Sequence, residues 1–180
     1  MMNRLRIIVT VFVIMVITAC KENIAKTNDN NAIVEQSNSE SNTAGATKES
    51  LPEFLLMDVN GNPVNLQNFR GKKIFVNLWA TWCPPCRAEI PSIEKLYRAT
   101  DTNKVAFIMV SLDDNFEKAK KYANKKKLKL PIYYPQKSLT GIFNVSSIPS
   151  TFIFDESGNL IQSIEGAADY NTSQFRDMLK

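Results

Sequence analysis

Residues 76–91 read Val76-Asn-Leu-Trp-Ala-Thr-Trp-Cys-Pro-Pro-Cys-Arg-Ala-Glu-Ile-Pro91. The largely apolar run from Ile74 to Trp79 predicts a buried strand. After the cysteines, apolar residues recur at the three-and-four spacing of one helix face, at Ile90, Ile93, Leu96 and Tyr97. Cys83 and Cys86 are therefore expected between the end of a strand and the start of a helix.

This placement predicts thiol chemistry. A thiol at a helix N-terminus faces unpaired backbone N–H groups and the positive end of the helix dipole. Both favour the thiolate, which is the nucleophilic form of cysteine. Cys86 lies one turn after Cys83, close enough to attack a mixed disulfide formed by Cys83. Half of a metal site or a passive disulfide is the other interpretation of such a pair, and the strand–motif–helix context disfavours it.

The composition excludes several other chemistries. The 180 residues include three cysteines and no histidine, so neither a Cys–His nor a Ser–His pair is possible. Two neighbouring thiols alone cannot complete a four-ligand zinc site. Arg87 stands where attachment of c-type haem requires histidine. We expect no metal and no cofactor, and the net charge of +4 gives no reason to expect nucleic-acid binding.

The N-terminus has the pattern of an export signal. Arg4 and Arg6 precede thirteen uncharged residues, Ile7 to Ala19, fewer than the roughly 20 of a membrane-spanning helix. Ile17-Thr-Ala-Cys20 resembles the lipobox of bacterial lipoproteins, in which the cysteine becomes the acylated first residue. We interpret residues 1–19 as a lipoprotein signal peptide and Cys20 as the lipidation site. A plain signal peptide or a short membrane anchor is the alternative.

Composition divides the rest of the chain. Residues 20–50 are rich in Asn, Ser, Thr, Ala and Glu and have no aromatic residue, which predicts a flexible tether with a reach of roughly 30 Å. Residues 51–180 are long enough for one folded domain. The stretch 118–129 contains seven lysines, for which a solvated helix face is favoured over contact with anionic lipid.

The remaining elements follow from hydrophobic patterns and turn signals. The stretches 54–59 and 63–66 flank Asn60-Gly61 and predict a hairpin. Further strands are predicted at 105–110, 130–134, 151–154 and 160–164, and helices at 116–127 and 171–179. Strands that alternate with helices and then end in a hairpin predict an α/β sandwich with a mixed sheet.

The stretch 76–91 resembles the active site of the thioredoxin superfamily, and more narrowly its membrane-tethered TlpA/ResA-like branch. Phe69-Arg-Gly-Lys72 and Ile148-Pro-Ser-Thr-Phe152 extend the resemblance over residues 51–180. It implies a thioredoxin fold, with a central mixed β-sheet flanked by helices. It also implies an N-terminal β-hairpin and a helix–strand unit inserted within 116–134.

The resemblance also implies roles for single residues. Pro149 matches the family's cis-proline, whose bond leaves the backbone of the preceding residue, here Ile148, open to an extended substrate. Glu89 matches a glutamate that influences the titration of the two thiols, and an exposed helix glutamate is the alternative. Trp82 is expected at an apolar docking rim, whereas Trp79 is expected in the core.

One position departs from thioredoxins proper. They carry a buried aspartate in the strand before the motif, and this chain has Asn77 there. Asn cannot titrate, so acid–base work would fall to Glu89, to water or to the thiols themselves.

We therefore expect an extracytoplasmic thiol–disulfide oxidoreductase, a monomer anchored by lipid in the bacterial cell envelope. The branch it resembles acts mostly as a reductant of client proteins, including apocytochrome c, and receives electrons from a membrane thiol donor. Two alternatives stay open. A peroxiredoxin-like peroxidase would need threonine three residues before Cys83, where Ala80 stands. A non-catalytic module could use the thiols only to bind a metal or a client.

Overall fold

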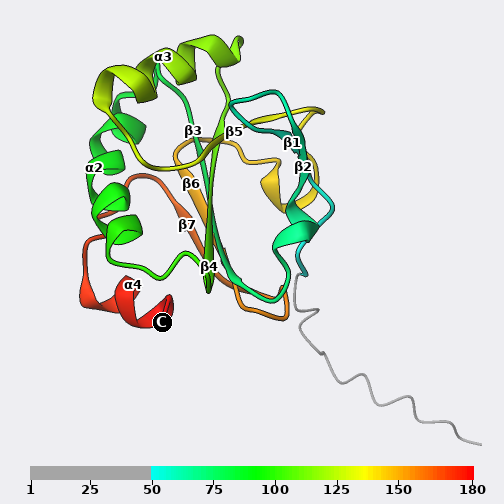
Figure 1. Ribbon diagram of the computed structural model, residues 1–180, viewed down its shortest axis with the longest axis vertical. Coiled ribbons are helices and arrows are strands. Elements are labelled where there is room, and N and C mark those ends of the chain that lie inside the picture. The colour runs from blue at the N-terminus through cyan, green and yellow to red at the C-terminus, as the bar shows by residue number, and fades with distance from the viewer. Residues whose placement is uncertain (1–49) are drawn as a thin grey trace, which may run out of the picture. The chain divides into compact units, whose positions relative to one another are not determined.

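A seven-stranded mixed sheet organises residues 50–180, the part of the chain that the computed structural model describes (Figure 1). Its strand order is β2-β1-β5-β4-β3-β6-β7. The strands are β1 (Leu55–Met57), β2 (Pro63–Asn65), β3 (Lys73–Trp79), β4 (Val105–Ser111), β5 (Ile132–Pro135), β6 (Ser150–Phe154) and β7 (Leu160–Glu165). The predicted signal peptide, Cys20 and most of the predicted tether lie outside the described residues, so those boundaries stay predictions.

The two central strands are buried along nearly their whole length. β3 and β4 pair in parallel over seven positions, from Lys73 opposite Val105 to Trp79 opposite Ser111. Every residue of the two strands is buried except Lys73, which is partly exposed. Strands covered on both faces have nearly continuous apolar runs, which is why such runs predicted β3 and β4 correctly.

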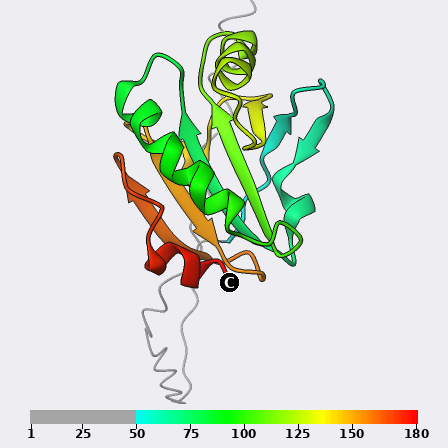
Figure 2. The ribbon, with the colours of Figure 1, turned by 60° about the vertical axis from the view of Figure 1, so that its left-hand side comes forward.

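Three α-helices cover one face of the sheet: α2 (Pro84–Arg98), α3 (Phe116–Lys126) and α4 (Ser173–Met178) (Figure 2). The chain steps from β3 to β4 to β5 in one direction across the sheet. Crossovers between parallel strands are right-handed, so two steps in the same direction place α2 and α3 on the same side.

The opposite face carries a second hydrophobic core. It is covered by the segment before β1, which contributes Leu51 and Phe54, and by two short 3-10 helices, η1 (Leu66–Phe69) and η2 (Gly141–Phe143). Alternate residues of β3 feed the two cores, with Phe75 on the α-helical side and Val76 on the other. The predicted sheet flanked by helices is confirmed, with α-helices on one face and 3-10 helices on the other.

The predicted N-terminal hairpin is confirmed, but it is shorter than expected. β1 and β2 pair antiparallel from Leu55 opposite Asn65 to Met57 opposite Pro63. Leu66, predicted at the end of the second strand, instead begins η1, because the Asn65 side chain caps the next turn.

The predicted helix–strand insertion is also present, as α3 followed by β5. The helix ends at Lys126, one residue before its predicted end, because Lys127 takes the left-handed conformation of a C-cap (φ 54°). β5 pairs with β4 on one side and with β1 on the other. The insertion therefore joins the N-terminal hairpin to the main sheet.

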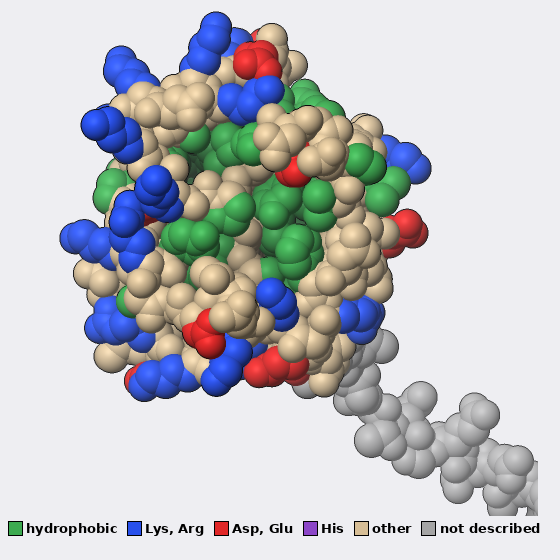
Figure 3. Space-filling model, viewed as in Figure 1, with side chains coloured by type: hydrophobic (Ala, Val, Ile, Leu, Met, Phe, Trp, Pro, Cys, Tyr) green, Lys and Arg blue, Asp and Glu red, His purple; other side chains and the backbone are tan. Residues whose placement is uncertain are grey.

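The lysine-rich stretch lies on the exposed side of α3 and the turn after it, as Figure 3 shows by the Lys and Arg side chains at the upper left. Lys118 pairs with Asp114, and Lys120 pairs with Glu117. Five more lysines of this stretch are exposed: Lys121, Lys125, Lys126, Lys127 and Lys129. This arrangement agrees with the predicted solvated helix face. Among residues 50–180, no helix combines the length and apolar character needed to cross a membrane.

Candidate active site

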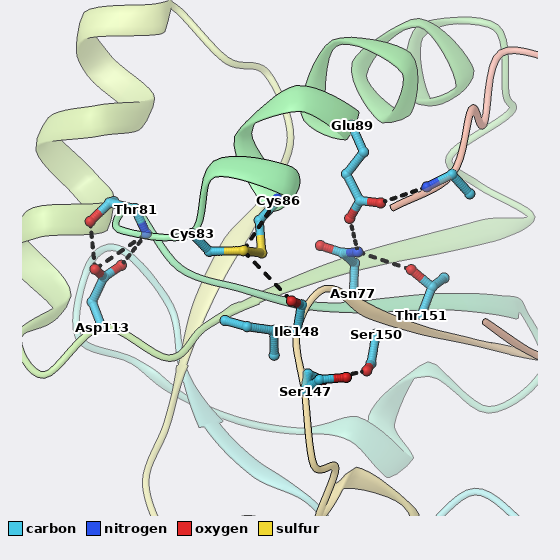
Figure 4. Close-up of a disulfide and its surroundings, with 11 residues drawn as sticks. Asn77, Thr81, Cys83, Cys86, Glu89, Asp113, Ser147, Ile148, Ser150 and Thr151 are labelled. Atoms are coloured by element: carbon cyan, nitrogen blue, oxygen red, sulfur yellow. Dashed lines mark hydrogen bonds between the residues drawn. A yellow bond between two sulfur atoms is a disulfide. The ribbon is translucent and has the colours of Figure 1, made fainter. Parts of the chain in front are cut away.

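Cys83 and Cys86 form a disulfide between the end of β3 and the start of α2 (Figure 4). Cys83 is the N-cap of α2, and its Sγ accepts a hydrogen bond from the Cys86 N–H at 3.2 Å. This is the strand–motif–helix arrangement predicted from the sequence. When the pair is reduced, the same N–H and the helix dipole stabilise a thiolate on Cys83.

The two sulfurs are not equivalent. Cys86 is fully buried, whereas Cys83 keeps 3% of its surface exposed. The Cys83 Sγ lies 3.7 Å from the carbonyl oxygen of Ile148. A disulfide sulfur carries no proton, but the reduced Cys83 thiol can donate to this oxygen.

A largely apolar groove of about 350 Å³ lies beside this contact. Its lining consists of Trp82, Leu112, Leu139, Val145 and residues 146–148. Trp82 is 62% exposed, and its role in docking stays a prediction, whereas Trp79 is 1% exposed and lies in the core as expected. Leu112, Leu139 and Val145 were not recognised from the sequence, because nothing local distinguishes them from core residues.

The Ile148–Pro149 peptide bond is cis, as the resemblance implies. Its loop is held in place on both sides of the bond. Ser150 Oγ donates to the Ser147 carbonyl at 2.8 Å, and the Gly166 N–H donates to the Pro149 carbonyl at 2.8 Å. The Ile148 carbonyl is thereby kept facing Cys83.

Glu89 lies one turn after Cys86 on α2 and is buried, so it is not an exposed helix glutamate. One carboxylate oxygen accepts from Asn77 Nδ2 at 2.8 Å, and the other accepts from the Ala168 N–H at 3.2 Å. Burial raises the pKa of Glu89 to about 7 although both hydrogen bonds act to lower it. At neutral pH the charged and neutral forms of this carboxyl group are therefore both populated.

Asn77 connects Glu89 to the strand that follows the cis-proline. Its Nδ2 also donates to Thr151 Oγ1 at 2.9 Å, and the Tyr170 hydroxyl donates to the same oxygen at 2.7 Å. Burial and the nearby Glu89 raise the pKa of Tyr170 well above its usual value, so its hydroxyl stays protonated. Sequence reasoning singled out Asn77 but missed Tyr170, which lies 19 residues from Thr151 and belongs to no motif.

Comparison with known proteins places this site in a family. The family described as Redoxin matches residues 46–179. The thioredoxin-like protein YneN of Bacillus subtilis (strain 168) is 37% identical over 118 residues, which are 64% of this chain and 69% of YneN. The thiol-disulfide oxidoreductase ResA of Geobacillus kaustophilus is 34% identical over 125 residues, which are 69% of this chain and 72% of ResA.

Solved structures give the same picture. StoA from Bacillus subtilis superposes with a TM-score of 0.61 at 25% identity, covering 72% of this chain and 97% of StoA. A putative thiol-disulfide oxidoreductase from Bacteroides vulgatus superposes with a TM-score of 0.65 at 26% identity, covering 74% of this chain and 96% of its own. These likenesses confirm the thioredoxin fold.

The names of these relatives favour disulfide exchange over the peroxidase and the binding module. The Cys83–Cys86 disulfide at the start of α2 is the group that such exchange requires. The chain belongs to the Redoxin family, and within it is a thiol–disulfide oxidoreductase of the ResA and StoA type.

Proposed function

We propose that this oxidoreductase works outside a bacterial cytoplasm, held to a membrane by a lipid on Cys20, and reduces disulfides or keeps thiols reduced in client proteins. Maturation of cytochrome c is the process we propose for it, with a membrane thiol carrier as the electron donor. It would act as a monomer. The observation that carries the exchange mechanism is the position of Cys83, which caps α2 at the edge of the apolar groove.

In the proposed reaction, the Cys83 thiolate attacks one sulfur of a client disulfide. The client's S–S bond breaks, a mixed disulfide with Cys83 forms, and the departing client thiolate takes up a proton. Cys86 then loses its proton and attacks the Cys83 sulfur, which releases the second client thiol. The client gains two electrons, and Cys83 and Cys86 are left as the disulfide found in the structure. A donor dithiol then reduces this disulfide by the same two exchange steps.

The groove is the feature that supports the proposed binding of an extended client segment. Trp82 and Ile148 lie on its lining, and the Ile148 carbonyl also faces the attacking sulfur. A client chain in this groove would place its disulfide beside Cys83 while apolar side chains exclude water.

The direction of the reaction is tested by the reduction potential of the Cys83–Cys86 pair. For a reductant we expect a value near that of thioredoxin, about −270 mV, measured by equilibration with glutathione or dithiothreitol buffers. A value near the −120 mV of the oxidant DsbA would contradict a reducing role while leaving exchange chemistry intact.

Substitution of the two cysteines tests which one attacks. Cys86→Ser should accumulate client proteins as mixed disulfides on Cys83, because the resolving thiol is gone. Cys83→Ser should trap few or none, since Cys86 is fully buried. Non-reducing gels of cell-envelope extracts measure the adducts. Trapping by the Cys83→Ser variant instead would reverse the assignment.

Glu89 should shape the pH dependence of the reduced thiols. Below about pH 7 its carboxyl is largely neutral, and above about pH 7 its negative charge opposes formation of a nearby thiolate. Glu89→Gln removes that charge and should lower the apparent thiol pKa by about 1 unit. The measurement is the alkylation rate of the reduced protein against pH. The exposed Glu117→Gln is the control, and superimposable profiles for wild type and Glu89→Gln would contradict this role.

Lipid attachment at Cys20 is tested separately from catalysis. In a bacterial host, Cys20→Ser should move the protein from the membrane fraction to the soluble fraction. Disulfide reductase activity of the purified protein should stay unchanged, because the exchange mechanism uses only Cys83 and Cys86. Membrane retention of the variant would contradict the anchor, and loss of activity would contradict the separation of roles.

A further inference from the structure

A second buried carboxylate, Asp113, lies beyond the network around Glu89. It lies two residues after the end of β4 and is only 3% exposed. Its Oδ1 accepts from the Thr81 hydroxyl at 2.5 Å, and its Oδ2 accepts from the Thr81 N–H at 3.1 Å (Figure 4). Oδ2 also accepts from the Ser111 hydroxyl at 2.8 Å. We call Thr81, Ser111 and Asp113 the Asp113 cluster.

The cluster holds the short segment that leads into the disulfide. Thr81 lies two residues before Cys83, and Asp113 binds it through both its backbone N–H and its side chain. Two backbone hydrogen bonds hold the same segment in place. The Leu112 N–H donates to the Trp79 carbonyl at 2.7 Å, and the Cys83 N–H donates to the Ala80 carbonyl at 3.2 Å.

Stability alone does not account for a carboxylate at this place. Removing a charged group from water is costly, and replacing buried charges with well-packed apolar residues is often neutral or stabilising. What a carboxylate provides is orientation, because two acceptor oxygens fix several donors at once. Here Oδ1 and Oδ2 together fix the N–H and the O–H of one residue, Thr81.

We propose that Asp113 is a positioning residue for thiol–disulfide exchange and acts on Cys83 through Thr81. By holding residue 81, Asp113 keeps the Cys83 sulfur in position to accept the hydrogen bond from the Cys86 N–H and to lie beside the Ile148 carbonyl. Trp82, between Thr81 and Cys83, is held at the groove rim by the same contacts. The segment after β4 thereby contributes to the geometry of Cys83, which lies between β3 and α2.

The test is dithiothreitol-driven reduction of insulin by the full chain, with kcat and KM measured for a matched pair of variants. Thr81→Val keeps the shape of the side chain and loses its hydroxyl, whereas Thr81→Ser keeps the hydroxyl. We expect Thr81→Val to lower kcat by about fivefold, the equivalent of one buried hydrogen bond, with KM within about twofold. Thr81→Ser should stay within about twofold of wild type.

Asp113→Asn separates positioning from simple electrostatics. If Asp113 acted only as a nearby negative charge, its removal would favour the thiolate and raise the rate. Positioning predicts the opposite, a fall in kcat at least as large as that of Thr81→Val. The adjacent, exposed Asp114→Asn is the control and should match wild type.

All variants are assayed well below their unfolding temperatures, determined by circular dichroism. Equal kcat values for Thr81→Val and Thr81→Ser, or a faster Asp113→Asn, would overturn the proposal. If Asp113→Asn does not fold, the Thr81 pair decides alone. Wild-type turnover of insulin is the reference. Its absence would contradict the exchange activity, whereas differences among variants of an active wild type bear only on the Asp113 cluster.

Discussion

The parallel ladder between β3 and β4 is the constraint on which the site depends. Its seven paired positions bring both strands to an end at the same edge of the sheet, with Trp79 opposite Ser111. The chain after β3 carries Cys83, and the chain after β4 carries Asp113. Ligands and reactive groups of α/β sheets gather at this edge because the loops after neighbouring parallel strands meet there.

β6 brings the third component to the same edge by running the other way. It is antiparallel to β3, and its first residue, Ser150, pairs with Leu78 near the end of β3. The preceding residues, Ile148 and Pro149, therefore lie beside the disulfide. An attacking sulfur, an apolar groove and a held peptide loop are assembled by pairing among three strands.

The pKa of Glu89 is set by burial and by neutral hydrogen-bond donors, and not by a nearby opposite charge. Glu89 has a pKa of about 7 because desolvation outweighs the neutral donors Asn77 and Ala168. An aspartate at position 77 would place a second acid within hydrogen-bond distance of Glu89, and such a pair holds a proton between its members. With asparagine there, Glu89 is the one group of this buried network that titrates near neutral pH.

The sequence by itself determined the features that depend on near neighbours. The apolar run of β3, the two cysteines and the helical spacing after them were enough to place Cys83 at a helix N-terminus. The absence of histidine removed several classes of catalysis, and the motif around Pro149 implied the cis bond that the fold contains. Such features arise from side-chain type and spacing within one or two elements, which a single sequence displays directly.

Only the tertiary structure decided which distant groups meet. Thr81 and Asp113 are 32 residues apart, and Glu89 and Ala168 are 79 apart, so no local pattern links them. The same holds for the gathering of α2, α3 and α4 on one face, which follows from the order of strands in the sheet. These contacts depend on strand register and crossover direction. A shift of one residue in the pairing of β3 with β4 or with β6 would move Asp113 and Glu89 away from their hydrogen-bond partners.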